Sequence, residues 1–321
     1  MTDVKIICDS KNEFGQRCIS AICTFPRYLL AEINTHRMLS RNSASSRAIR
    51  FERMVESVQK NPFIPKKWQR DHTGMQGTEY FTQEEINIKN LVHHWLSARD
   101  NAIAEATRLN KLGVTKQLCN RYLEPFMYHT ALITATELEN FFALRAEDMA
   151  EVHLQELAYK YLDACNASEP KLLKAGEWHI PFGDQFDNEQ LISIAHYQLT
   201  KFKPDFAPSV HDLQPVLDDL QVKLATVRCA RISYVTPGSE QKINYTADLE
   251  LHDRLASSGH WSAFEHCTRA MSQTDFEGSE TRFNFNTQQM ELGWYGNFRG
   301  FIQYRKMFEN ENRRDPRLLK K

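Results

Sequence analysis

The sequence predicts an α+β (α/β) protein in which long helices pack against a mixed sheet. Thr82-Gln-Glu-Glu85 has the pattern of a capping box, and the apolar periodicity after it predicts a helix over 83–111 that Gly113 ends. The run 226–235, TVRCARISYV, alternates in a way that predicts a strand. The 321 residues, of which 41% are hydrophobic and 25% charged, suffice for one large domain or two ordinary ones.

Further helices are predicted from capping residues, helical spacing of apolar residues and the prolines or glycines that bound them. They span residues 27–37, 115–123, 134–145, 149–164 and 247–257. The helix at 134–145 opens with a second capping-box pattern, Thr134-Ala-Thr-Glu137, and the helix at 247–257 ends at Gly259. Residues 166–222 have weaker periodicity, and we expect them to form a connecting segment with short helices of its own.

Charge and hydropathy exclude several classes of partner. The net charge is −1, so no global field draws the protein to nucleic acid or to an anionic membrane. The N-terminus lacks a secretory apolar core, and no apolar stretch approaches the ~18 residues that a membrane span needs. We therefore expect a cytoplasmic protein with neither a membrane nor a nucleic-acid partner.

Common cofactor and metal signatures are absent from the sequence. Neither a Gly-x-Gly-x-x-Gly fingerprint nor a phosphate-binding loop is present. The seven cysteines are scattered without a Cys-x-x-Cys pair, which favours reduced thiols over disulfides or zinc ligands. The spacing of His260, Glu265 and His266 fits no set of ligands on a helix face, so we expect no metal.

Arginine is concentrated between residues 37 and 53. Five arginines, at positions 37, 41, 47, 50 and 53, accompany a single acidic residue, Glu52. Guanidinium groups bind phosphate through two parallel hydrogen bonds, and the serines and asparagine of the segment can donate further ones. The segment is therefore either an anion-binding site or a solvated basic loop.

Three groups of residues resemble the flavin-dependent thymidylate synthases. The first is Thr35-His36-Arg37, seven residues, then Ser45-Ser46-Arg47, where the family has Arg-His-Arg, seven residues, Ser, a small residue and Arg. The second is Arg121-Tyr-Leu-Glu-Pro125 with Asn140-Phe-Phe-Ala-Leu-Arg145. The third is Cys229-Ala-Arg-Ile-Ser233-Tyr234 with Gly259-His260-Trp-Ser262-Ala-Phe264-Glu265-His266.

The order of these groups differs from that of the family. There the third group precedes the first, whereas here it comes last, so the chain looks circularly permuted. Permutation is physically plausible because the termini of compact domains often lie close together. The resemblance implies a permuted flavin-dependent thymidylate synthase-like fold in which residues 1–165 bind nucleotide and flavin. Residues 166–222 then connect them to 223–321, a second flavin-binding part of the same catalytic unit.

The resemblance also assigns roles to individual residues. By resemblance FAD is contacted by His36, Arg37, Asn140, Ser233, His260, Ser262 and Glu265. By resemblance the nucleotide is bound by Glu32, Ser45, Ser46, Arg47, Arg121 and Arg145. Arg145 is in addition the catalytic residue, because a guanidinium at the pyrimidine ring stabilises the charge pushed toward C5.

Three positions depart from the family pattern. Thr35 replaces an arginine, Glu32 stands where the family usually has glutamine, and Thr134 replaces a flavin-contacting asparagine. The segment 296–306 is dense in arginine and aromatic residues. It is expected either to supply the charge missing at position 35 or to form a packed β-edge.

The implied activity is flavin-dependent transfer of a one-carbon unit from methylenetetrahydrofolate to C5 of a pyrimidine deoxynucleotide monophosphate, dUMP to dTMP. NADPH re-reduces the flavin, and the family assembles as a homotetramer. No cysteine follows a proline or precedes a histidine, which fits a route without a protein nucleophile. Two alternatives stay open: a dUMP or dCMP hydroxymethylase using the same site, and a non-catalytic nucleotide- or nucleic-acid-binding protein.

Overall fold

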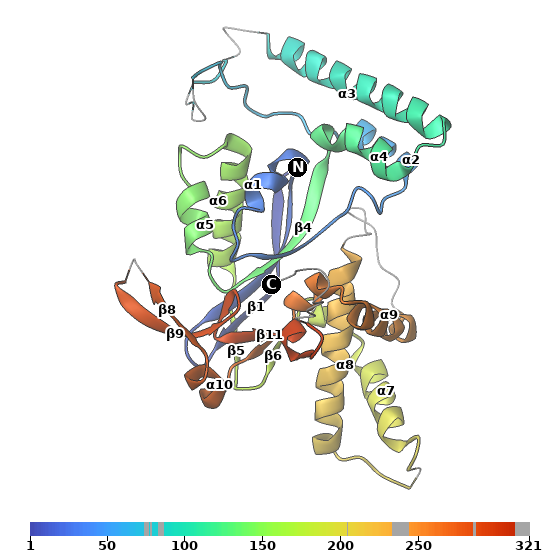
Figure 1. The fold of residues 1–321 in the computed structure, drawn as a ribbon, viewed down its shortest axis with the longest axis vertical. Coiled ribbons are helices and arrows are strands. Elements are labelled where there is room, and N and C mark those ends of the chain that lie inside the picture. The colour runs from blue at the N-terminus through green and yellow to red at the C-terminus, as the bar shows by residue number, and fades with distance from the viewer. Residues whose placement is uncertain are drawn as a thin grey trace, which may run out of the picture.

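A computed structural model describes residues 1–73, 77, 79–82, 87–203, 205–232, 244–284 and 287–311. The protein has the mixed α+β composition expected from its sequence, with a five-stranded sheet at the centre (Figure 1). The strand order is β3-β4-β2-β1-β5; β5 runs parallel to β1, and the other pairs are antiparallel. The bounds are β1 Asp3–Asn12, β2 Arg17–Pro26, β3 Ser40–Ser43, β4 Tyr128–Ala135 and β5 Lys171–Leu173.

Two small antiparallel sheets accompany the central one. The first has the order β10-β9-β8, and its β8–β9 hairpin projects from the body of the molecule (Figure 1). The second has the order β11-β7-β6. Their strands are β6 Trp178–His179, β7 Thr268–Ala270, β8 Glu280–Asn284, β9 Gln289–Tyr295, β10 Phe298–Arg299 and β11 Phe301–Gln303.

Helices surround the central sheet. The α-helices are α1 Leu30–Ile33, α2 Phe51–Lys60, α3 Ile88–Lys111, α4 Lys116–Cys119, α5 Glu139–Arg145, α6 Val152–Ala167, α7 Asn188–Thr200, α8 Val210–Arg231, α9 Tyr245–Ser258 and α10 Gln273–Glu277. The 3₁₀ helices are η1 Arg27–Leu29, η2 Asn120–Phe126, η3 Gly183–Gln185, η4 Trp261–Glu265 and η5 Tyr304–Met307. In Figure 1, α5 and α6 lie on one side of the sheet and α8 on the other.

Strand β2 shows how the sheet is buried on both faces. Successive side chains of a strand point to opposite faces. Ala21, Cys23 and Phe25 belong to the core that α5 and α6 cover, together with Leu157 and Tyr161. Ile22, between them, packs instead with residues of α8 and η4, among them Cys229 and Phe264. The middle of the sheet thus separates two cores, and the C-terminal third supplies one of them.

Three of the predicted helices are confirmed. Helix α3 follows the predicted pattern from Ile88, and Gly113 lies just after it with a left-handed φ of 87°. Helix α6 occupies the expected stretch, and α9 ends at Gly259, whose φ is 74°. A glycine reaches this conformation without the steric cost that a side chain would bring. Of the capping box at 82–85, residues 83–85 lie outside the described part of the chain.

The strand predicted at 226–235 is wrong. Its residues up to Arg231 form the end of helix α8, and 233–235 lie outside the described residues. Helix α8 begins far upstream, at a true capping box between Ser209 and Asp212. The helix is buried on every side from Leu224 to Ala230, so its apolar run has no helical period and imitates a strand.

The capping box predicted at Thr134 is also wrong. Thr134 belongs to β4, where it pairs with Ser20, and α5 begins only at Glu139 without a side-chain cap. The predicted helix at 27–37 ends at Ile33, since η1 and α1 give way to a turn that carries His36. The helix predicted at 115–123 is two short elements, and η2 continues through Pro125.

The segment 166–222 is more structured than the sequence suggested. It contains β5, β6, η3 and α7, and α8 begins within it and runs on past residue 223. No helix in the described part of the chain is long and apolar enough to cross a membrane.

Candidate functional site

Arg145 ends helix α5 beside the turn that follows α1. Its Nε donates a hydrogen bond to Nε2 of His36 at 3.0 Å. Its Nη1 lies 3.9 Å from a carboxylate oxygen of Glu32. The Arg145 side chain keeps 24% of its surface exposed and that of Glu32 keeps 42%. Arg145 therefore meets Glu32 and His36, which precede it by 113 and 109 positions, at a solvent-accessible spot.

His36 is the buried support of this group. The edge of its ring meets Phe141 of α5, with ring centroids 5.0 Å apart and planes at 84°. Burial, together with Arg145 and Arg41, lowers the pKa of His36 below its ordinary value. The ring is consequently neutral at physiological pH, and its Nε2 accepts from Arg145 rather than repelling it.

Arg41 fixes the turn between α1 and β3. Its Nη1 donates to the backbone carbonyls of Ile33 at 2.7 Å and of His36 at 3.1 Å. Burial lowers the pKa of Arg41, an effect that the nearby Glu265 opposes and Arg37 reinforces. The environment of Arg41 therefore links the turn carrying His36 to Glu265, more than 200 residues later in the chain.

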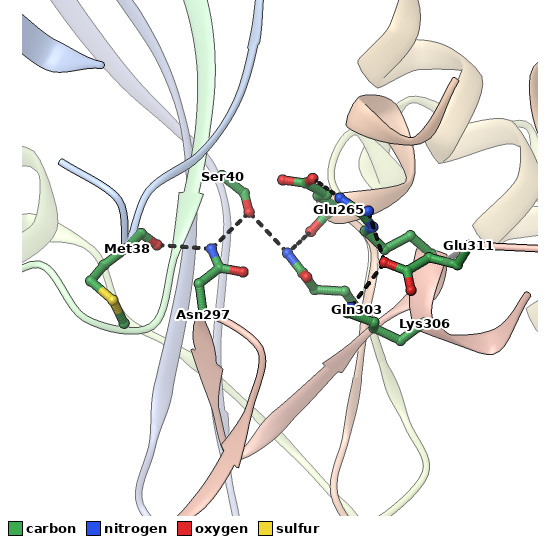
Figure 2. A network of polar contacts seen from close by, with 8 residues as sticks. Met38, Ser40, Glu265, Asn297, Gln303, Lys306 and Glu311 are labelled. Atoms are coloured by element: carbon green, nitrogen blue, oxygen red, sulfur yellow. Dashed lines mark hydrogen bonds and ion pairs between the residues drawn. The ribbon is translucent and has the colours of Figure 1, made fainter. Parts of the chain in front are cut away.

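Glu265 is held by residues of strand β11 and the 3₁₀ helix η5, as Figure 2 shows. Its carboxylate pairs with Arg305, and its backbone carbonyl accepts from Nε2 of Gln303 at 3.3 Å. Gln303 and Asn297 both donate to the hydroxyl of Ser40, at 2.9 and 3.0 Å, and Asn297 also reaches the carbonyl of Met38 (Figure 2). These bonds fasten residues 265–303 to the start of β3.

The segment 296–306 contains two short strands and two arginines that form ion pairs. Residues 298–299 and 301–303 form β10 and β11, as a packed β-edge requires. Arg299 pairs with Glu291 at 2.9 Å, while Arg305 pairs with Glu265. A cation from this segment does reach the candidate site, although it lies at Glu265 rather than beside Thr35.

His260 and Ser262 line a small cavity next to this network. The cavity has a volume of about 100 Å³, and Asn42 of β3 contributes to its wall. Both His260 and Ser262 are exposed, and His260 Nδ1 lies 2.7 Å from the hydroxyl of Ser258. Segments 36–47 and 260–266 are thus neighbours in space, as a shared site requires.

Ser46 and Arg121 meet at a different point, on Glu124 of η2. The hydroxyl of Ser46 donates to the Glu124 carboxylate at 2.6 Å, and Arg121 lies 3.7 Å from it. Ser45, which precedes Ser46, is half-buried, and Arg47 is exposed.

Arg53, the last arginine of the segment 37–53, lines a cavity of about 620 Å³ between α2 and the ends of β2 and β4.

Two other predicted FAD contacts are exposed on the surface of the single chain. Arg37 and Asn140 make no side-chain hydrogen bond or ion pair with any residue that the structure describes. Ser233 lies outside the described residues.

Sequence reasoning missed a buried polar chain beneath the site. The hydroxyl of Thr134 lies 2.6 Å from that of Ser20 and 2.8 Å from Nδ1 of His266, and Ser20 lies 2.8 Å from Nε2 of His179. Burial lowers the pKa of both His179 and His266 to about 3, so both rings are neutral. Thr134 therefore fixes the ring that follows Glu265, and this contact joins elements that no sequence pattern relates.

Comparisons with known proteins find only a partial structural similarity. No family model and no curated protein matches the chain. Among solved structures, the chain is similar to the UMP/dUMP methylase PolB from Streptomyces cacaoi bound with 5-Br UMP, at 14% identity and a TM-score of 0.41, over 51% of this chain and 88% of that one. For the same methylase bound with 5-Br dUMP the identity is 13% and the TM-score 0.43, over 51% and 90% of the two chains.

Proposed function

We propose that this protein transfers a one-carbon unit from methylenetetrahydrofolate to C5 of a pyrimidine deoxynucleotide monophosphate, with FAD as cofactor and NADPH as reductant. The observation that carries the proposal is the setting of Arg145. Nε of Arg145 donates to His36, whereas the Glu32 carboxylate lies 3.9 Å from Nη1, at the limit of an ion pair. The Nη1 and Nη2 groups of Arg145 are therefore available to a ligand. The guanidinium is held in one orientation before any ligand arrives.

A fixed guanidinium suits this chemistry. C5 of a pyrimidine becomes nucleophilic only when negative charge is spread over the ring nitrogen and the adjacent carbonyl. A donor that is already oriented toward those atoms stabilises the charge without the cost of reorganisation. The Nε bond to a neutral, buried His36 supplies that orientation, because the Arg145 side chain cannot rotate without breaking it.

The donor set fits FAD. The Arg37 guanidinium, exposed and unpaired among the described residues, suits a diphosphate, which arginine binds in bidentate fashion. His260 and Ser262 offer side-chain donors beside a cavity of about 100 Å³, below the roughly 300–1,000 Å³ of complete ligand sites. One chain therefore provides only part of a flavin-binding site. We propose that the protein forms a homotetramer whose subunits share the flavin. FAD, when bound, would supply hydride transfer, the step that protein side chains cannot perform.

The nucleotide, methylenetetrahydrofolate, NADPH and a proton give the 5-methyl nucleotide, tetrahydrofolate and NADP⁺, so that C5–H is replaced by C5–CH₃. The hydroxymethylase alternative consumes water in place of NADPH and leaves CH₂OH at C5. Arg145, His36 and Glu32 would serve both outcomes equally.

Mass spectrometry of the nucleotide products tests this function. The purified protein is incubated with FAD, methylenetetrahydrofolate and NADPH, and with dUMP or dCMP. A gain of CH₂ supports methylation, and a gain of CH₂O shifts the proposal to hydroxymethylation. An unchanged nucleotide, with a folded protein that retains no flavin, would support the binding-only alternative.

A further inference from the structure

We infer that Glu32 and Arg145 together select a cytosine nucleotide over a uracil nucleotide. This inference rests on the proposed function, in which a pyrimidine ring lies against Arg145. It names the base, which the motifs of the sequence leave open between uracil and cytosine.

The two side chains present opposite hydrogen-bonding characters to one ligand. Arg145 can only donate, and after Nε is used by His36 its Nη1 and Nη2 groups remain. Glu32, when ionised, can only accept. Their nearest atoms are 3.9 Å apart, and both side chains are partly exposed, so one flat ring edge can contact both.

Glu32 is also the carboxylate of this cluster that is free to accept. Its neighbour Glu151 is already occupied, since it accepts from the ring of His153 at 2.7 Å and from the amides of His153 and Leu154 at 2.9 Å each. Among the described residues, the Glu32 carboxylate has one hydrogen-bond donor nearby, Nη1 of Arg145, at the long distance of 3.9 Å. A ligand amino group would give it a better one.

Cytosine matches this arrangement of donors and acceptors. Its edge presents O2 and N3 as adjacent acceptors, which a guanidinium fork can bind in parallel, followed by the N4 amino group as donor. A carboxylate accepting from cytosine N4 is a common form of base recognition. Neutral uracil places N–H at N3 and a carbonyl oxygen at C4, so two donors would face each other and two acceptors would face each other.

The ionisation of Glu32 depends on the groups around it. Burial and the charge of Glu151 raise its pKa, while Arg145 opposes that rise. Tyr28 also lies within electrostatic reach of Glu32, Arg41 lies behind the turn, and His36 is neutral. Preference for cytosine belongs to the carboxylate form, because a protonated Glu32 would carry a donor that O4 of uracil could accept.

Nucleotide binding tests the inference by isothermal titration calorimetry, with FAD present throughout. We expect the unmodified protein to bind dCMP at least ~10-fold more tightly than dUMP, a difference of about 1.4 kcal/mol, which one good base-edge contact can supply. In Glu32→Gln the amide both donates and accepts, and the ratio should fall to within about threefold. Glu169→Gln, the same charge change at an exposed position without a described partner, should keep the original ratio.

The binding results distinguish a failure of base selection by Glu32 from a failure of the proposed function. Equal or tighter binding of dUMP by the unmodified protein, or a ratio that Glu32→Gln leaves unchanged, overturns the inference while both nucleotides still bind. If neither nucleotide binds more tightly than 2-deoxyribose 5-phosphate, the proposed function fails and the inference with it. Because Glu32 is partly exposed, Glu32→Gln should fold normally, which a thermal unfolding curve checks.

Discussion

Replacing Arg145 by lysine removes the geometry of this site while it keeps the charge. Lysine has no counterpart of Nε, so the 3.0 Å bond to His36 is lost, and its ammonium is a point charge in place of a fork. The loss of one oriented donor to a developing anion costs about 2.7–4 kcal/mol, or 10²–10³-fold in kcat. We therefore expect turnover to fall at least ~10²-fold while FAD binding persists, because Arg145 is assigned to the nucleotide.

The assay measures steady-state product formation and, separately, FAD affinity by flavin fluorescence. Arg254→Lys is the matched control, since Arg254 is exposed on α9 and its side chain has no described partner. Near-normal turnover in Arg145→Lys would show that the catalytic assignment of Arg145 is wrong. Loss of FAD together with turnover would place Arg145 in the flavin site instead.

Three further predictions concern the flavin, the base and the fold. Glu265→Ala and Arg37→Ala should each weaken FAD binding, and their double mutant should be non-additive by about 0.5–3 kcal/mol; energies that add within ~0.3 kcal/mol would refute a shared site. The preference for dCMP should decline as pH falls, beginning above the ordinary Glu pKa of ~4.3, because burial and a neighbouring carboxylate raise the pKa of Glu32; a ratio independent of pH down to ~4 would exclude Glu32 as its origin. The free energy of unfolding should fall as pH is lowered from ~6.5 toward ~3, by about 1.4 kcal/mol per pH unit for each of His179 and His266, because these histidines bind protons in the unfolded chain but not when buried. Equal free energies of unfolding in urea at pH 6.5 and pH 5 would contradict this.

The sequence predicted helix ends correctly where neighbouring residues alone determine them. Helix α9 ends at Gly259 because the chain needs a left-handed residue there, and that requirement is visible in the sequence. The alternation at 226–231 misled because complete burial of the last turns of α8 removes the polar side that marks a helix. Thr134 misled because its hydroxyl bonds across the sheet to Ser20 rather than to its own backbone.

The candidate site depends mostly on contacts that no local pattern contains. The contact between His36 and Arg145 spans 109 positions and was not predicted, because the resemblance assigned His36 to FAD and Arg145 to the nucleotide. The proximity of Glu265 to the turn carrying His36 was anticipated, because the resemblance assigned both residues to FAD. Gln303, Asn297 and Ser40, which fasten these parts together, belong to no motif, so only the fold reveals them (Figure 2).

The most direct test of the proposed function follows the transferred carbon. The protein is supplied with FAD, NADPH and methylenetetrahydrofolate whose methylene carbon is isotopically labelled, and dCMP and dUMP are offered in competition. We predict that the label appears at C5 of the pyrimidine, in the cytosine nucleotide before the uracil nucleotide, and that Arg145→Lys slows its appearance at least ~10²-fold. A folded, FAD-loaded protein that leaves both nucleotides unlabelled would contradict the proposal.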